Sequence, residues 1–182
     1  ADKIPLFLAT FQNRKVIKCK NPEGIRTMIN CEFENSNKAS LRHVVVDNLV
    51  LKDDKILLVK RTGKLLEGGK WGLISGFVDR DENIKEAAVR EILEETGYTV
   101  EGLTLLRIID APNRPAEDRQ NISFVHFCTA LEKVGTADDE SDEQVWFDLS
   151  ALPPQEEFAF DHFSNIELYK EYLKKSFSIP RI

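Results

Sequence analysis

The sequence predicts an α/β fold in which several strands combine with two amphipathic helices. Segments with the apolar and β-branched composition of strands occur at 43–51, 56–61, 103–110, 121–131 and 143–149. Apolar residues recur at helical spacing in two further segments, near 84–96 and 164–177. At 182 residues, the chain is long enough to bury the core of one domain with an appendage.

Charge and composition argue against several classes of protein. The hydrophobic content of 42% and the charged content of 31% are typical of soluble globular chains. The net charge of −6 comes without a long basic run, so no nucleic acid partner is expected. No apolar run approaches transmembrane length, so no membrane partner is expected either. Cys19, Cys31 and Cys128 form no tight pattern, which favours reduced thiols in a cytoplasmic protein.

Residues 1–40 are predicted to form a β-rich extension ahead of a main domain at 41–182. Segment 15–19 alternates in polarity, and 25–34 has the pattern of a second strand. Residues 35–40 are polar and are predicted to be a linker. The extension is expected to pack on the domain or on a second subunit.

A glutamate-rich helix carries the most specific pattern in the sequence. Glu91, Glu94 and Glu95 fall at i, i+3 and i+4, which stacks their carboxylates on one helix face. Like charges placed so closely repel one another, whereas a hard divalent ion such as Mg²⁺ takes oxygen ligands of this kind. Gly76 is predicted to allow a tight loop before the helix, and Gly97 to end the helix in a left-handed conformation.

This stretch resembles the Nudix box, which is Gly, five residues, Glu, seven residues, and then Arg-Glu-aliphatic-x-Glu-Glu-x-Gly and a bulky apolar residue. The positions in register are Gly76, Glu82, Arg90, Glu91, Ile92, Glu94, Glu95 and Gly97. Tyr98 holds the last place, where an aliphatic residue is usual, and Ser75 stands where many members carry another glycine. The resemblance covers roughly residues 41–177.

The resemblance implies a Nudix-type α/β/α sandwich with a mixed β-sheet and a short N-terminal β extension. It implies hydrolysis of a nucleoside diphosphate linked to another moiety, so the partner is a small-molecule nucleotide. Mg²⁺ is the implied cofactor, with Mn²⁺ as an alternative ion. Glu91, Glu94 and Glu95 would hold the metal with the Gly76 carbonyl, and Glu91 and Glu94 are the first candidates for catalysis.

Three further roles follow from the same resemblance. Arg90 would orient the box glutamates through salt bridges, with Glu86 at i−4 as its partner. Glu82 would support the loop before the helix. The general base would be a box glutamate or a residue of the acidic loop before strand 143–149, with Glu140 as first choice there and Glu143 as second.

The loop at 111–120 is similar to a marker of the Nudix enzymes that act on ADP-ribose, because Pro112 lies fifteen residues after the box glycine. Guanidinium groups suit bidentate contact with phosphate. Arg114 is the first candidate for this contact and Arg119 the second, while Arg61 ends a strand near the expected site. The preferred reaction is hydrolysis of ADP-ribose to AMP and ribose 5-phosphate.

Other functions stay open at this point. The substrate could be NADH, another nucleotide sugar or a nucleoside triphosphate. A non-catalytic ADP-ribose-sensing module is an alternative of another class, although such modules usually lose box glutamates that this chain keeps. A structural dimer module is the weakest alternative, because it gives no reason for clustered carboxylates. The ADP-ribose group frequently forms homodimers, so a homodimer is expected from the resemblance.

The C-terminal helix is predicted to begin at Ser164 as N-cap, with Glu167 as its capping-box partner. The segment before it resembles the end of the ADP-ribose-type members, and Phe160 and His162 within it are assigned structural roles. The histidines show no ligand pattern, so zinc catalysis is not expected.

Overall fold

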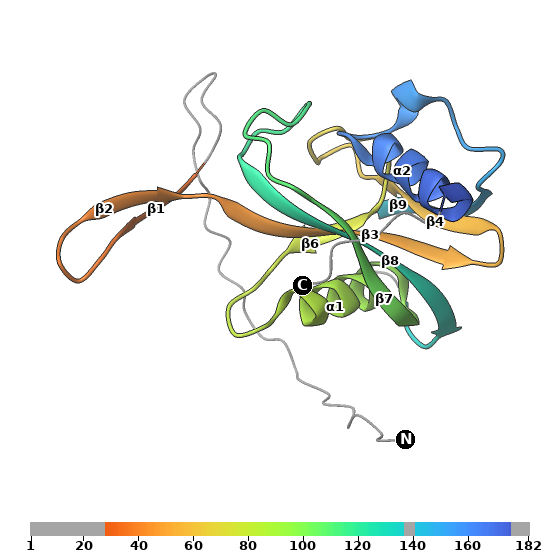
Figure 1. Ribbon diagram of the computed structural model, residues 1–182, viewed down its shortest axis with the longest axis horizontal. Helices are drawn as coiled ribbons and strands as arrows, with labels where there is room; N and C mark the ends of the chain where they lie inside the picture. Colours follow the sequence, from red (N-terminus) through yellow and green to blue (C-terminus); the bar gives the residue numbers. More distant parts are fainter. Residues whose placement is uncertain (1–27, 137–140, 176–182) are drawn as a thin grey trace.

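The computed structural model of the chain describes residues 28–136 and 141–175 and places a mixed β-sheet between two helices (Figure 1). The elements, in chain order, are β1 (Ile29–Glu32), β2 (Lys38–Leu41), β3 (His43–Lys52), β4 (Lys55–Arg61), β5 (Trp71–Gly72), β6 (Ile74–Phe77), α1 (Ile84–Thr96), β7 (Tyr98–Ile109), β8 (Asn121–Lys133), β9 (Ser141–Asp148), the 3₁₀ helix η1 (Gln155–Glu157) and α2 (His162–Lys175).

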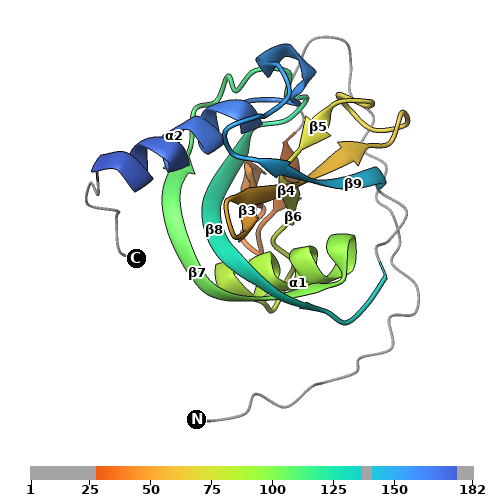
Figure 2. The same cartoon turned by 90° about the vertical axis from the view of Figure 1, so that its right-hand side faces the viewer.

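The main sheet has seven strands in the described part of the chain, with the order β5-β4-β3-β8-β7. Strand β6 pairs with β3, and β9 pairs with β4. The β3–β8 pair is parallel and the other pairs are antiparallel, which makes the sheet mixed. The helices α1 and α2 lie on opposite sides of this sheet (Figure 2). The predicted α/β/α sandwich with a mixed sheet is confirmed.

Strand β3 lies at the centre of the core because both of its faces are covered. Alternate side chains of a strand point to opposite faces of the sheet. On one face, Val46 packs with Ala87 and Ala88 of α1. On the other face, Leu49 belongs to the core that contains Ile166 of α2. Burial on both faces explains why the sequence of this strand is almost continuously apolar.

Helix α1 has the bounds and the C-terminus that the sequence predicts. Asn83 caps its first turn, and Glu86 completes a capping box by accepting a hydrogen bond from the Asn83 N–H at 2.8 Å. Gly97 adopts a left-handed conformation with φ of 75°, and its N–H donates to the Leu93 carbonyl. Glu86 is therefore engaged at the start of the helix rather than by Arg90.

Helix α2 begins at His162, so the predicted N-cap at Ser164 is wrong. The Asp161 carbonyl accepts hydrogen bonds from the N–H groups of Ser164 and Asn165, which starts the first turn earlier. The Ser164 hydroxyl also donates to this carbonyl, at 2.8 Å, instead of capping a later N–H group. In the described residues, no helix is long and apolar enough to cross a membrane.

The N-terminal hairpin of β1 and β2 extends away from the main sheet (Figure 1). Residues 38–41 pair with β1, so the prediction of a polar linker at 35–40 is wrong for its second half. The turn includes Ser36, which has a positive φ of 65°. Segment 15–19 and Cys19 lie outside the described residues. The division at residue 40 and the packing of this extension on a second subunit stay predictions.

Candidate active site

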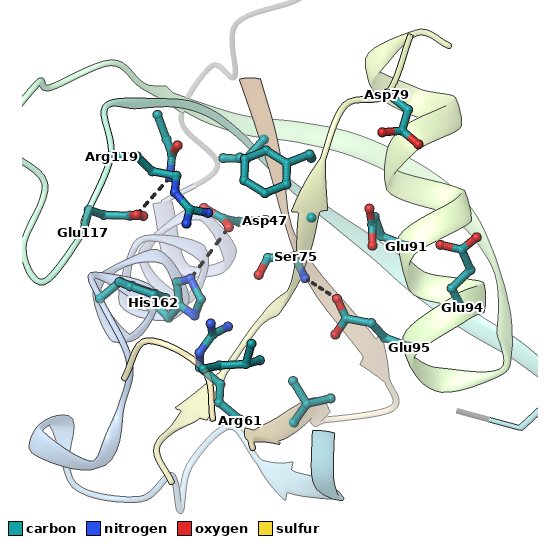
Figure 3. Close-up of a pocket in the computed structure, with 17 residues that line it drawn as sticks. Asp47, Arg61, Ser75, Asp79, Glu91, Glu94, Glu95, Glu117, Arg119 and His162 are labelled. Atoms are coloured by element: carbon teal, nitrogen blue, oxygen red, sulfur yellow. Dashed lines mark hydrogen bonds and ion pairs between the residues drawn. The ribbon is translucent and has the colours of Figure 1, made fainter. Parts of the chain in front are cut away.

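A cavity of about 380 Å³ has walls of contrasting chemistry (Figure 3). One wall, called the acidic wall below, carries the carboxylates Asp79, Glu91, Glu94 and Glu95. The wall opposite combines two arginines with a histidine and two carboxylates, namely Arg61, Arg119, His162, Asp47 and Glu117. Asn121, the first residue of β8, donates to Glu117 and also lines the cavity. The first wall comes from α1 and the loop before it, whereas the second combines β3, β4, the loop before β8 and the start of α2.

Gly76 gives the Glu91 carboxylate the room that it occupies. A Cβ atom on Gly76 would lie 2.0 Å from Cδ and 2.1 Å from Oε1 of Glu91, which is far inside contact distance. Gly76 belongs to β6 and pairs with Val46 of β3, so its predicted role in a tight loop is wrong. The glycine is required by close approach, because any side chain would displace the carboxylate.

Arg90 links the residues around the start and middle of α1. Its Nε and Nη2 donate to the two carboxylate oxygens of Glu82, at 2.9 and 2.6 Å. Its Nη1 donates to Glu91 at 2.7 Å and to Glu94 at 3.0 Å. The hydrogen bonds to Glu82 above all, with those to Glu91 and Glu94, raise the pKa of Arg90 despite its burial. Glu82, and not the predicted Glu86, is its main partner.

Glu82 also supports the loop before α1. Its Oε1 accepts a hydrogen bond from the Asp79 N–H at 2.6 Å, in addition to the bond from Arg90. Arg90 in turn donates from Nη2 to the Phe77 carbonyl at 2.9 Å. Together these bonds fasten the loop between β6 and α1, which carries one of the carboxylates of the acidic wall.

Glu95 is the most buried glutamate of the acidic wall, with 6% of its surface exposed. Its Oε1 accepts a hydrogen bond from the Ser75 N–H at 3.2 Å (Figure 3). Its backbone carbonyl accepts a bond from Gln144 Nε2 of β9 at 2.6 Å. The end of α1 is thereby attached to both β6 and β9.

The acidic wall suits a hard divalent cation by its donor type. Carboxylate oxygens are the ligands that Mg²⁺ prefers, and Glu91, Glu94 and Glu95 line the same cavity. Within the described residues, no three His, Cys, Asp or Glu side chains are grouped closely enough to hold a metal ion as they stand. Glu91 and Glu94 accept hydrogen bonds from Arg90 instead. The fit therefore rests on the donor atoms, on their shared wall and on the space left by the glycine of β6.

Arg114 lies behind the opposite wall, and the structure gives it a different role from the predicted phosphate contact. Its side chain is 3% exposed and is not among those that line the cavity. Its Nη2 lies 2.6 Å from Asp161 Oδ1 and 3.2 Å from Asp47 Oδ2, and its Nη1 lies 3.5 Å from Glu117 Oε1. Burial alone lowers the pKa of this guanidinium, but the carboxylates around it raise the pKa above its ordinary value.

Arg114→Ala is expected to lower the free energy of unfolding by about 3–5 kcal/mol, because it leaves buried carboxylates without their cation. Urea denaturation at neutral pH would measure the change. Arg80→Ala is the matched control: the side chain of Arg80 is 92% exposed, so a change within about 0.5 kcal/mol is expected. If Arg114→Ala were as stable as the control but raised the KM for substrate, the phosphate role would hold after all.

Asp47 and His162 join β3 to the start of α2 at the base of this wall. Asp47 is 3% exposed and accepts a hydrogen bond from Ser123 Oγ. His162 Nδ1 accepts the Leu73 N–H at 3.0 Å, and its Nε2 lies 3.7 Å from Asp47 Oδ1 (Figure 3). Burial raises the pKa of Asp47, but His162, Arg114 and Ser123 outweigh burial and hold it well below the ordinary value.

Sequence reasoning missed Asp47 as a residue of the site. The signal for it was present, because a charged residue inside an apolar strand is rarely buried unless it is paired. His162 keeps its predicted structural role and also lines the cavity. Phe160 likewise lines the cavity, and its positive φ of 53° is unusual for a bulky residue.

Two predicted arginines do line the cavity, and each lies next to an aromatic ring. Arg61 Cζ lies 5.1 Å from the centroid of the Phe160 ring, and Arg61 Nε donates to the Leu66 carbonyl. Arg119 Cζ lies 5.4 Å from the centroid of the Phe77 ring. A guanidinium stacks favourably on an aromatic face, so these rings help to position the cations of the second wall.

The remaining predicted residues lie elsewhere. Pro112 is exposed in the loop before β8 and does not line the cavity. Glu140 lies outside the described residues. Glu143 is exposed on β9, where it pairs with Lys60 of β4, and it does not line the cavity. Among the described candidates for the general base, only the box glutamates reach the cavity.

Comparison with known proteins identifies a matching family model and several similar proteins. A family model described as the NUDIX domain matches residues 41–169. The chain is 37% identical over 131 residues to the "ADP-ribose pyrophosphatase" of Methanocaldococcus jannaschii. This match covers 72% of the chain and 73% of that protein. It is 31% identical over 106 residues to the "NAD-capped RNA hydrolase NudC" of Pseudomonas aeruginosa, and this match covers 58% of the chain but 36% of that protein.

Solved structures share the fold as well. The crystal structure of a MutT NUDIX hydrolase from Burkholderia pseudomallei superimposes with a TM-score of 0.60 and 29% sequence identity. The match covers 69% of this chain and 96% of that one. The sandwich of sheet and helices described above is therefore of the Nudix type.

Proposed function

Since this chain belongs to the Nudix family of pyrophosphohydrolases, we propose that it hydrolyses ADP-ribose to AMP and ribose 5-phosphate with Mg²⁺. The observation that carries this proposal is the cavity with a carboxylate wall facing a wall that bears two arginines. The similarity to an ADP-ribose pyrophosphatase over 72% of the chain supports this choice of substrate.

The charges of the two walls suit a diphosphate. The acidic wall repels an anion unless a cation is held there, and Glu91, Glu94 and Glu95 would hold that cation. When bound, a divalent ion offsets the charge of the diphosphate and lowers the pKa of a water molecule. On the opposite wall, Arg61 and Arg119 present guanidinium groups, which recognise phosphate oxygens in a bidentate manner.

The protein's own groups then orient the reactants and accept the proton. Arg90 fixes the Glu91 and Glu94 side chains through its hydrogen bonds, so that their carboxylates face the cavity in a defined position. A box glutamate takes the proton from the attacking water. Of these glutamates, Glu94 is the one with substantial exposure, at 37% of its side chain, compared with 14% for Glu91. We therefore assign Glu94 as the proton acceptor.

A substrate panel tests this function directly. ADP-ribose, NADH, UDP-glucose and dGTP are incubated with the full chain in Mg²⁺, and the products are separated by chromatography. We expect kcat/KM to be highest for ADP-ribose, with AMP and ribose 5-phosphate as products. EDTA should abolish the activity, and excess Mg²⁺ should restore it.

Two outcomes of the panel would contradict the proposal. Turnover of dGTP without turnover of ADP-ribose would favour a triphosphate substrate. Tight binding of ADP-ribose without hydrolysis in Mg²⁺ would favour a sensing module. Calorimetric titration with ADP-ribose, run beside the activity assay, separates the second outcome from an inactive preparation.

A further inference from the structure

Glu117 and Asn121 form a polar pair in the cavity that the hydrolysis itself does not use. Figure 3 shows Glu117 beside Arg119, across the cavity from the glutamates of α1. Asn121 Nδ2 donates to Glu117 Oε2 at 2.9 Å, and Arg114 Nη1 lies 3.5 Å from Glu117 Oε1. The carboxylate is thereby held in one orientation, with 8% of the side chain exposed.

Asn121 has an unused acceptor. The residue is 6% exposed and lines the cavity, yet its Oδ1 is buried and accepts no hydrogen bond from the described residues. Leaving a buried acceptor unpaired is unfavourable, so a small rotation of the amide that lets a ligand donate to Oδ1 would recover that energy. The neighbouring Glu117 carboxylate adds acceptor lone pairs at the same end of the cavity.

The chemistry of this pair favours hydroxyl groups rather than a second cation. Two guanidinium groups lie close by, because Arg114 contacts Glu117 and Arg119 lines the same wall. Their charge opposes a metal ion at this end. Burial is the main influence on Glu117 and raises the pKa of its carboxyl, although Arg114 and Asn121 act in the opposite direction. A sugar hydroxyl is a neutral donor, so the guanidinium groups do not repel it, and it can donate to the carboxylate in this buried position.

We propose that Glu117 and Asn121 bind the hydroxyl groups of a ribose attached beyond the diphosphate, and so select nucleoside diphosphate sugars over nucleoside triphosphates. The neighbouring Arg119 would hold a phosphate of the same ligand. This inference rests on the proposed pyrophosphatase function and adds to it a subsite that reads the sugar. Glu117 and Asn121 act in binding and do not accept the proton of the attacking water.

Binding of non-hydrolysable ligands separates this subsite from catalysis. The α,β-methylene analogues of ADP-ribose and of ADP differ by the distal ribose, and calorimetry in Mg²⁺ gives their Kd values. Glu117→Gln is expected to weaken binding of the ADP-ribose analogue about 10- to 100-fold, because hydrogen bonds to charged groups contribute roughly 1.5–3 kcal/mol. Binding of the ADP analogue should stay within about twofold. Glu101→Gln, on an exposed residue of β7, is the matched control.

A ligand-side change tests the subsite without any mutation. The wild-type protein should bind the ADP-ribose analogue less tightly when its distal ribose lacks the 2-hydroxyl. In Glu117→Gln this deletion should cost less than in the wild type, because the partner of the hydroxyl is already lost. Asn121→Ser should show the same selective loss for the sugar ligand.

Three results would overturn the inference. Equal weakening of both analogues by Glu117→Gln would place the residue at the diphosphate or in the fold. No weakening of either, with kcat also unchanged, would remove it from the ligand. Unchanged Kd values with a collapse of kcat would make it a proton-transfer group. A wild-type protein that binds the sugar analogue selectively but does not hydrolyse ADP-ribose would contradict the proposed function and leave the subsite intact.

Discussion

Replacement of Glu91, Glu94 or Glu95 by Gln is expected to lower kcat for the metal-dependent hydrolysis by about 10²-fold or more. Each change removes a negative charge from the acidic wall while keeping the size of the side chain. Loss of an anionic metal ligand costs several kcal/mol, and each 1.36 kcal/mol corresponds to a factor of ten in rate. The measurement is steady-state hydrolysis of ADP-ribose over a series of Mg²⁺ concentrations.

The Mg²⁺ series distinguishes loss of a ligand from general damage. A variant that has lost a ligand should need more Mg²⁺ for half-maximal activity, and an unfolded one should not respond to Mg²⁺. Glu171→Gln, on the exposed face of α2, is the control and should keep the wild-type rate. If Glu94→Gln and Glu95→Gln both stay folded and fully active, the acidic wall is not the metal site.

Gly76→Ala is expected to lower kcat by about 10²-fold without unfolding the protein. The added Cβ would overlap the Glu91 carboxylate. This carboxylate would have to move, and its hydrogen bond to Arg90 would be disturbed. Misplacement of a catalytic group by about 1 Å can cost this factor. Gly63→Ala is the matched control, because a Cβ at Gly63 meets nothing within 4 Å.

A double variant tests the cause of the Gly76 effect. If the added methyl group acts by displacing Glu91, then Gly76→Ala combined with Glu91→Ala should be no slower than Glu91→Ala alone. The single Glu91→Ala variant leaves empty space where the methyl group would fit. Additive losses in the double variant would show that Gly76→Ala acts through the strand pairing of β6 instead.

The elements that sequence patterns predicted correctly depend on contacts between near neighbours in the chain. Helix α1 was predicted at its observed bounds because its apolar spacing and the glycine after it are both local features. The shared face of Glu91 and Glu94 follows from helical spacing in the same way. Errors arose where a choice between local partners depended on the fold. Arg90 had Glu86 in reach along the helix, but Glu86 accepts from the Asn83 N–H, and Arg90 donates to Glu82 of the preceding loop.

The opposite wall of the cavity was beyond the reach of local patterns. Asp47 and Arg114 are 67 positions apart in the sequence, and they meet because the parallel pairing of β3 and β8 brings their surroundings together. Arg114 and Arg119 have the same chemistry in the same loop, so composition could not tell which is buried and which faces the cavity. Burial decided their roles, since a guanidinium enclosed by carboxylates has no surface left for phosphate.

The chain's sequence was therefore sufficient for the family, the helix that carries the box glutamates and the class of reaction, because the box is a continuous segment whose spacing places its glutamates on one face. The folded chain alone shows why Gly76 must lack a side chain, that Arg114 is buried behind the cavity wall, and that Glu117 and Asn121 line the cavity. These features arise where segments distant in the sequence meet. The residue spacing within one segment does not determine which other segment it contacts.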